Sequence, residues 1–308
     1  MSKLTLLTVG AFVLLLAACG GGSDGDGPAA TAAPTASTPA AGACAPARAH
    51  DAGEFEQTIT SGGLQRNYIV HVPPGYDGSE PVPLVFLLHG FALTGRIMLD
   101  YTLLGDVADR EGFIIVAPNG TGDPQFWNAR EDASGPDDLL FVDDLIDSLS
   151  ADLCIHAERV FATGYSNGGG MSIRLACDRP ERIRAVGVVA SIFIECASDV
   201  PLLAFHGVQD PLVSFDGGEM FPSIREAAAS WAEAMGCSPD PELVAISADI
   251  EQTVYNGCPA GDGLTQLYVV QSGGHTWPGG AEGIGEAALT TQEVSASELI
   301  WEFFANAP

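Results

Sequence analysis

Apolar runs alternate with amphipathic segments along most of the chain, and changes in their period mark the predicted elements. Two strand-like runs, 54–60 and 66–72, flank Ser61-Gly62-Gly63, which predicts an antiparallel hairpin. Beyond this hairpin, short continuous apolar runs alternate with segments of helical period. Further strands are predicted at 83–89, 113–117, 159–163, 185–190, 201–205 and 264–270, and helices at 98–110, 137–153, 167–177, 224–235 and 295–304.

Continuous apolar strands that alternate with helices are typical of a parallel sheet with both faces covered. The hairpin and six parallel strands therefore predict an α/β sandwich of three layers around an eight-stranded sheet, with no insertion long enough for a large lid domain. Thr290 and Glu293 have capping-box spacing and predict the start of the last helix. Ligands of such sheets bind at the carboxyl ends of the strands, so chemistry is expected there.

The first 47 residues have a different pattern. Residues 1–18 combine Lys3 with an apolar run that is short for a membrane span, which is typical of a signal peptide. Leu16-Ala17-Ala18-Cys19-Gly20 resembles the lipobox of bacterial lipoproteins, in which the cysteine thiol carries diacylglycerol; the alternative is an ordinary secretory signal that contains a cysteine. Residues 19–47 predict a flexible tether, and 48–308 a folded domain.

Composition narrows the partners and the location. Of the 308 residues 46% are hydrophobic, which suffices for a sizeable core, and the formal net charge is −28. A surface with that charge repels nucleic acid and anionic lipid headgroups, so membrane contact is expected only through the lipid on Cys19. Gly20 is not the aspartate that resembles an inner-membrane retention signal, so the outer membrane is expected if the source is Gram-negative. The oligomeric state is left open.

Six cysteines remain when Cys19 is set aside, and an even number in an exported chain predicts up to three disulfides. Cys237 ends a predicted helix and Cys258 a predicted strand, so these two are expected to pair. The other four, Cys44, Cys154, Cys177 and Cys196, allow three pairings. The sequence has no CxxC or HxxxH pattern, so neither a metal nor a cofactor is expected.

Gly164-Tyr165-Ser166-Asn167-Gly168 has the form GxSxG. Gly21-Gly22-Ser23-Asp24-Gly25 in the tether has it too, so context must separate them. Ser166 follows strand 159–163 and opens helix 167–177, the strand–turn–helix of a nucleophile elbow. The flanking glycines are expected because a Cβ would clash where strand and helix come close. The nearby helix N-terminus favours developing negative charge.

A serine nucleophile needs a base, expected later in the chain. Only His206 and His275 follow Ser166. His275 lies in a glycine-rich loop just past strand 264–270 and is the expected base. His206 is inside a strand-end string and is expected to hydrogen-bond in the core.

The acid that orients the base should lie between them in the chain. Asp210 is best placed, after strand 201–205 and before Pro211. Asp216 is the alternative, and Asp199 precedes its strand and would lie at the wrong end. Asp137 and Asp138 are expected to cap their helix.

Two backbone N–H groups should form the oxyanion hole. Asn167 follows the nucleophile and should supply one, and Phe91, in the loop after strand 83–89, the other; the alternative reading of His89-Gly90 is a simple strand-end turn. Trp127 and Trp277, with Tyr165, are expected to line a substrate cleft, and core packing is the alternative for the tryptophans.

Together these strings resemble carbohydrate esterase family 1, which includes polyhydroxybutyrate-depolymerase-like proteins and type C feruloyl esterases. The strings are His89-Gly90, Gly164-Tyr-Ser166-Asn-Gly-Gly-Gly-Met171, His206-Gly-Val-Gln-Asp210-Pro211 and Gly273-Gly-His275-Thr-Trp-Pro-Gly279. The resemblance runs from about Cys44 to Phe304. It implies an α/β-hydrolase fold and a metal-free serine esterase with Ser166 as nucleophile, Asp210 as orienting acid and His275 as base.

The resemblance leaves the substrate open among feruloyl, acetyl and short hydroxyalkanoate esters. The 308 residues hold no appended polymer-binding module, so a preference for soluble oligomers is expected. A serine peptidase of the same fold and a non-catalytic binding lipoprotein on a hydrolase scaffold are the alternatives. All three triad positions hold the right residue types in the right chain order, which favours an enzyme.

Overall fold

The computed structural model describes residues 43–130, 132, 134–191, 196, 198–219, 221–282 and 287–308. The expected signal peptide, Cys19 and most of the expected tether lie outside the described residues. The strands are β1 (Gly53–Ser61), β2 (Leu64–Val72), β3 (Val82–Leu88), β4 (Ile114–Pro118), β5 (Ile155–Tyr165), β6 (Val186–Val189), β7 (Leu202–Gly207), β8 (Glu242–Ala245), β9 (Ile250–Tyr255) and β10 (Thr265–Val270).

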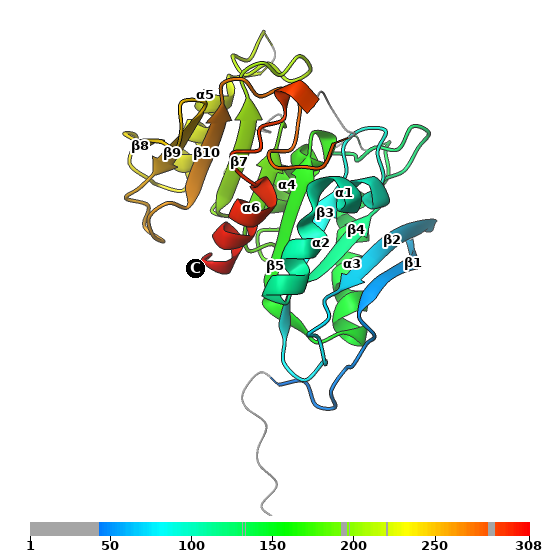
Figure 1. Ribbon diagram of the computed structural model, residues 1–308. Helices are drawn as coiled ribbons and strands as arrows, with labels where there is room; N and C mark the ends of the chain where they lie inside the picture. Colours follow the sequence, from blue (N-terminus) through cyan, green and yellow to red (C-terminus); the bar gives the residue numbers. More distant parts are fainter. Residues whose placement is uncertain are drawn as a thin grey trace, which may run out of the picture. The chain divides into compact units, whose positions relative to one another are not determined.

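These strands form one sheet with the order β1-β2-β4-β3-β5-β6-β7-β10-β9-β8 (Figure 1). The six from β4 to β10 in that order pair parallel, and the hairpin β1-β2 joins antiparallel to β4. The α/β class is therefore as expected, but the sheet has ten strands instead of eight. The additional β8 and β9 pair antiparallel at the far edge, where β8 is short and mostly exposed and β9 holds several polar residues, so neither has a strong strand pattern.

Helices cover both faces because the parallel strands are apolar on both. In β3, Phe86 packs into one core cluster, while its neighbours Val85 and Leu87 pack into the other. The first cluster holds residues of α3 (Asp138–Asp152), α4 (Asn167–Asp178) and α5 (Ile224–Ala234). The second holds residues of α1 (Gly95–Thr102), α2 (Leu104–Glu111) and α6 (Ala296–Ala305) (Figure 1). A short 3₁₀ helix, η1 (Ala287–Leu289), precedes α6.

Two helix boundaries differ from the expectation. The single helix expected over 98–110 is two helices, because Leu103 between them has a left-handed φ of 56°. The Thr102 hydroxyl donates to Met98 O and accepts the Leu104 N–H, which satisfies backbone groups at this break. The last helix is capped by Ser295, whose Oγ accepts the Glu298 N–H, and not by the expected Thr290.

The described cysteines form three disulfides, which is typical of proteins that fold outside the cytoplasm. Cys237 pairs with Cys258, the pair expected from the sequence, and the other two bonds are Cys44–Cys154 and Cys177–Cys196.

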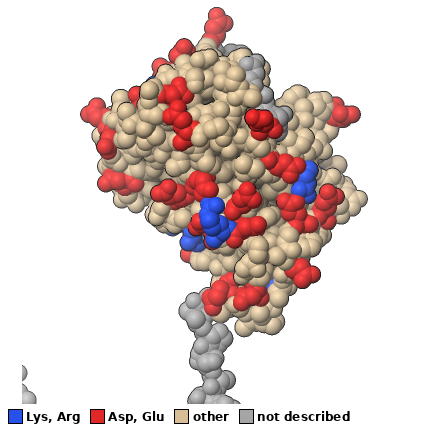
Figure 2. Space-filling model, viewed as in Figure 1, with Lys and Arg blue, Asp and Glu red and all other residues tan. Residues whose placement is uncertain are grey.

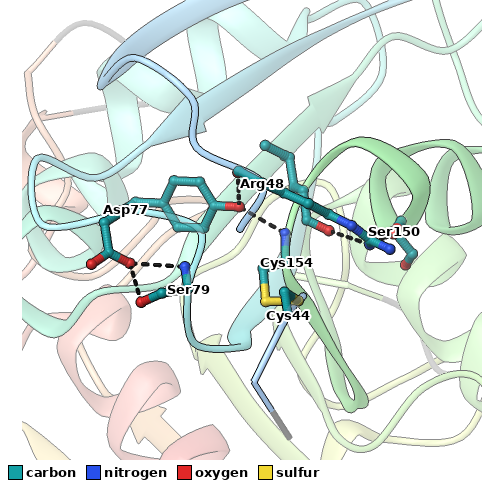
Figure 3. Close-up of a disulfide and its surroundings, with 8 residues drawn as sticks. Cys44, Arg48, Asp77, Ser79, Ser150 and Cys154 are labelled. Carbon is teal, nitrogen blue, oxygen red and sulfur yellow. Dashed lines mark hydrogen bonds between the residues drawn. A yellow bond between two sulfur atoms is a disulfide. The ribbon is translucent and has the colours of Figure 1, made fainter. Parts of the chain in front are cut away.

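Residues 44–47, which the sequence pattern assigns to the tether, are bound to the domain at the start of β5 (Figure 3). Besides the Cys44–Cys154 disulfide, the Tyr76 hydroxyl donates to Arg48 O and accepts the Cys154 N–H at 2.7 Å. The Arg48 guanidinium bonds to the Ser150 carbonyl. The chain therefore joins the folded domain at the amino end of β5, the end opposite Ser166.

Carboxylates are spread over the molecular face drawn in Figure 2, with only a few arginines between them. This distribution agrees with the net charge of −28. Within the described ranges, no helix has the length and apolar character that crossing a membrane requires.

Candidate active site

Ser166 lies in a tight turn between β5 and α4, with φ 54° and ψ −117°. Such values are uncommon for a residue with a side chain and occur at strained functional turns. The neighbouring glycines are required by close contact. A Cβ on Gly164 would lie 2.3 Å from Gly168 O, and one on Gly168 would lie 2.2 Å from Leu88 O. The local geometry is therefore that of the expected elbow.

His275 and Asp210 are hydrogen-bonded, with 2.7 Å between His275 Nδ1 and Asp210 Oδ2. Their loops approach closely at Gly207, where a Cβ would lie 2.2 Å from Gly273 O. A carboxylate at Nδ1 fixes the tautomer in which Nδ1 has the proton and Nε2 is the acceptor.

The Asp210 carboxylate is held ionised. Burial raises its pKa, but hydrogen bonds from His275 and from the Val213 and Leu212 N–H groups outweigh burial and lower it. Both N–H groups reach Oδ1 at 2.8 Å, so each carboxylate oxygen has a defined partner. The acid is thus fixed in place and charged beside the imidazole.

Tyr165 orients the His275 loop instead of contacting substrate as expected. Its hydroxyl donates to His275 O at 2.6 Å, and its ring centroid is 5.0 Å from that of the imidazole. The side chain is 4% exposed, and it does not line the cleft. Burial raises the Tyr165 pKa far above its usual range, so the hydroxyl remains a donor.

Of the two residues expected to form the oxyanion hole, Asn167 directly follows Ser166 and Phe91 follows Gly90 in the loop after β3. Asn167 is the first residue of α4, so its N–H has no acceptor within the helix. Gly90 is close to the serine, since a Cβ there would lie 3.4 Å from Ser166 Cβ. The Ala92 N–H is occupied by Gln125 O at 2.8 Å, whereas Phe91 N–H has no partner among the described residues.

His89 holds this loop, so His89-Gly90 is more than a simple turn. Its Nε2 accepts the Gly120 N–H at 2.9 Å, and its Nδ1 donates to Gly90 O at 2.8 Å. Burial lowers the His89 pKa to about 4, so the ring is neutral. A neutral ring is required, because only an unprotonated Nε2 can accept.

A cavity of about 810 Å³ begins at Ser166 and extends between the loops that follow β4 and β7. Aromatic and apolar groups dominate its wall. The main lining residues are Phe126, Trp127, Arg130, Ser166, Asn167, Leu212, Val213, Phe221 and Ile224.

The two tryptophans expected in the cleft are both buried. Trp277 is fully buried, donates through Nε1 to Ser297 Oγ at 3.1 Å, and does not line the cavity, so the expected substrate contact is wrong and the core alternative holds. Trp127 contributes to the cavity wall, but its side chain is only 1% exposed and its Nε1 donates to His89 O at 3.0 Å. It mainly supports the loop around His89.

The remaining titratable candidates have structural positions. His206 Nε2 donates to Val213 O at 2.9 Å in the core, where burial lowers its pKa, as expected for a histidine that is not the base. Asp137 caps α3 by accepting the Leu140 N–H. Asp138 does not cap: it is buried, pairs with Arg66 at 2.8 Å and accepts the Asn128 N–H. Asp216 is exposed and does not line the cavity.

Sequence reasoning missed Arg130 and the cavity-lining side chains Leu212, Val213 and Phe221 of the segment after β7. Neither the loop that holds Arg130 nor this segment has a periodic pattern, so no local signal in the sequence marks them. Over the parts of the chain that the structure describes, no group of His, Cys, Asp and Glu side chains is arranged to hold a metal ion.

Comparison with known proteins agrees with this geometry. A family model described as "Esterase PHB depolymerase" matches residues 66–209. The chain is 30% identical over 283 residues to "Probable feruloyl esterase C" of Aspergillus terreus, covering 84% of this chain and 92% of the relative. It is 31% identical over 263 residues to "Feruloyl esterase C" of Emericella nidulans, covering 81% and 88%.

The fold is also similar to the solved structure titled "Acetyl xylan esterase from Aspergillus awamori". The TM-score is 0.61 at 14% identity, with 82% of this chain and 99% of that chain covered. The kinship in sequence favours an enzyme over a binding scaffold and an esterase over a peptidase. The chain belongs to the esterase family of the feruloyl esterases C, and it is a carboxylic-ester hydrolase with an α/β-hydrolase fold.

Proposed function

We propose that the protein is an exported, lipid-anchored serine esterase that works through an acyl-enzyme. The observation that carries the mechanism is the 2.7 Å bond between His275 Nδ1 and Asp210 Oδ2, in a loop cluster at the same sheet edge as the strained Ser166. A histidine held in this tautomer can take a proton at Nε2, which is what a serine nucleophile requires.

In the proposed cycle His275 removes the Ser166 proton as Oγ attacks the ester carbonyl. The Asn167 and Phe91 N–H groups stabilise the oxyanion; in support, Asn167 directly follows Ser166, Phe91 follows Gly90, which is close to Ser166, and neither N–H has an acceptor among the described residues. The alcohol leaves with the proton from His275. Water, activated by the same histidine, then releases the acid and restores Ser166. Asp210 remains charged throughout and stabilises the imidazolium.

For the substrate we propose feruloyl, acetyl or short hydroxyalkanoate esters. The names of the relatives support this range, and the apolar wall formed by Phe126, Leu212 and Phe221 suits an uncharged acyl or aryl group.

For the anchor we propose diacylglycerol on Cys19, with residues 19–47 as tether. The tether would join the folded domain at Cys44, far from Ser166, and this position would leave the cleft accessible to substrate. Cys154 precedes β5 and Ser166 follows it, and eleven residues of strand separate the two by roughly 35 Å. The tether would thus be attached at the sheet edge opposite the active site. Mass spectrometry of the amino-terminal peptide would test the anchor; an unmodified peptide that begins elsewhere than Cys19 would refute it.

The experiment for the catalytic proposal compares the wild type with Ser166→Ala on p-nitrophenyl acetate, methyl ferulate and a 3-hydroxybutyrate oligomer. Ser79→Ala, at the Cys44–Cys154 end of the domain, is the control for a serine replacement. We expect the first variant to lose several orders of magnitude in kcat while its melting temperature is retained, and the control to be unaffected. Near-normal turnover by Ser166→Ala would overturn the assignment of the nucleophile.

A further inference from the structure

Arg130 and Phe221 meet across the cleft. Arg130 lies in the loop 119–137 after β4, and Phe221 in the loop 208–223 after β7. The sheet order places these strands on opposite sides of β5, whose end presents Ser166. The Arg130 guanidinium carbon lies 4.7 Å from the centroid of the Phe221 ring, and both residues line the cavity that contains Ser166. The contact therefore connects the two walls of the cleft.

The guanidinium of Arg130 has no hydrogen-bond or ion-pair partner in the part of the chain that the structure describes. Among the arginines of the described ranges, all but Arg130 and Arg184 have a carboxylate or a backbone carbonyl as partner. Of these two, only Arg130 lines the cavity, where it is the single basic residue of the described wall. In a chain with 40 acidic and 12 basic residues, an arginine without an acidic partner is uncommon enough to require an explanation.

Two acidic residues, Asp132 and Glu219, line the same cavity, but neither forms an ion pair with Arg130 among the described residues. Asp132 Oδ1 accepts from both Ser134 N and Ser134 Oγ, and these bonds lower the Asp132 pKa. The Asp132 carboxylate therefore already has its hydrogen-bond partners within its own turn.

The Arg130 guanidinium carbon lies over the Phe221 ring, and no N–H of this guanidinium has a hydrogen-bond partner among the described residues. The N–H donors of arginine lie in the guanidinium plane, in a fork that matches a carboxylate. Contact with the Phe221 ring restrains the Arg130 side chain before a ligand arrives and so reduces the entropy lost on binding.

We propose that Arg130 binds a free carboxylate on the substrate, and that the preferred esters have such a group on their acyl or alcohol part. This inference rests on the proposed function, because it assigns a substrate class to the same cleft. A linear hydroxyalkanoate oligomer has this chemistry at its end, whereas a simple alkyl ferulate or acetate does not. Arg130 is the single basic residue of the described wall, so a substrate carboxylate in the cavity would have the Arg130 guanidinium as its one oppositely charged partner among the described lining residues.

The test uses substrate pairs that differ only in the carboxylate. The linear dimer of 3-hydroxybutyrate and its methyl ester place the charge on the alcohol part. The p-nitrophenyl half-ester of adipic acid and its methyl ester place it on the acyl part, and only p-nitrophenol release is measured. The variants are Arg130→Gln and Arg130→Lys, and the matched control is Arg184→Gln, which removes the same charge at an exposed position outside the cleft.

We expect the wild type to prefer the charged member of at least one pair in kcat/KM, and Arg130→Gln to reduce that value about tenfold to a hundredfold. Turnover of the uncharged partner should change less than threefold. Arg130→Lys should recover only part of the loss, and Arg184→Gln should match the wild type. The pair that responds identifies whether the carboxylate belongs to the acyl or the alcohol part.

Equal kcat/KM for the charged and uncharged members of both pairs would overturn the inference and leave the esterase intact. An equal loss on both members in Arg130→Gln would also overturn it, because Arg130 would then only hold the two loops. If the wild type hydrolyses none of the esters, the proposed function fails instead. Calorimetric titration of Ser166→Ala with the dimer would still test Arg130: binding that Arg130→Gln does not weaken refutes the carboxylate site.

Discussion

The side chain of Asn167 holds the backbone of Trp127 at both its donor and its acceptor. Asn167 Oδ1 accepts the Trp127 N–H at 2.7 Å, and Asn167 Nδ2 donates to Trp127 O at 3.1 Å. Trp127 in turn donates through Nε1 to His89 O. The residue after Ser166 thus connects the elbow to Trp127 in the cleft wall and, through Trp127, to His89 at the end of β3.

Replacing Asn167 with Ala should therefore reduce both stability and activity. The variant leaves the buried Trp127 N–H without its acceptor, which costs about 1–3 kcal/mol of the free energy of unfolding. The Asn167 backbone N–H remains, so kcat should fall tenfold or less, well short of Ser166→Ala. Urea unfolding and steady-state kinetics measure both effects, with the exposed Asn306→Ala as control. An unchanged free energy of unfolding would show that the hydrogen bonds from the Asn167 side chain to the Trp127 backbone do not stabilise the fold.

Tyr165→Phe should lower kcat with little change in KM. The variant removes only the hydroxyl that donates to His275 O, so it frees the loop of the base without touching the cleft wall. We expect a loss of about 1 kcal/mol in stability and a severalfold decrease in kcat. A rise in KM at constant kcat would instead indicate that Tyr165 contacts the substrate.

His89 makes stability depend on pH. Its pKa is about 4 in the folded protein, against 6.5 for an ordinary histidine. Between these values the unfolded chain binds the proton and the folded one does not, so the contribution is complete above pH 6.5 and is lost as the pH falls towards 4. The loss amounts to about 3 kcal/mol.

The His89 contribution can be isolated with His89→Gln, which cannot titrate. Urea unfolding at pH 7 and pH 4.5 gives the decrease in stability for each protein. The decrease should be smaller in the variant, even if the variant is less stable at both pH values. An identical decrease would mean that the buried ring is not the source.

Asp138→Asn should destabilise the cleft wall. Asp138 and Arg66 are both nearly inaccessible, with side-chain exposures of 0% and 3%, and Asp138 Oδ2 also accepts the Asn128 N–H. Removing one charge leaves the other buried and unpaired, at a cost of about 3 kcal/mol or more. The double variant Arg66→Met with Asp138→Leu should recover part of this loss. Thermal unfolding of the wild type and the two variants measures these differences; a double variant less stable than Asp138→Asn would contradict the expected cost of the unpaired buried charge.

Much of the sheet, and the meeting of Asp210 with His275, could be predicted because the signals are local. Each of these residues directly follows an apolar strand, and the carboxyl ends of parallel strands meet at one edge. Strands β8 and β9 were not predicted because strands at the edge of a sheet are partly exposed and therefore need no continuous apolar run.

The side-chain surroundings depend on contacts between distant segments, so the sequence pattern could not supply them. Trp127 and Trp277 are buried, with their Nε1 groups donating to His89 O and Ser297 Oγ, and a tryptophan in a strand-end loop suits a cleft or a core equally. The Arg130–Phe221 contact joins two loops without periodic pattern. Leu103 interrupts a helix although its own residue type favours one.

Covalent labelling with a p-nitrophenyl phosphonate ester tests the assignment of Ser166 as the nucleophile most directly, because the reagent leaves a stable adduct on an activated serine. Intact mass and peptide mapping should show one adduct per chain, on the peptide that contains Ser166. Labelling should be absent in Ser166→Ala and slowed by orders of magnitude in His275→Ala, because without the base the hydroxyl is a weak nucleophile. An adduct on another residue, or equal labelling of Ser166→Ala, would contradict the central claim that Ser166 is the nucleophile.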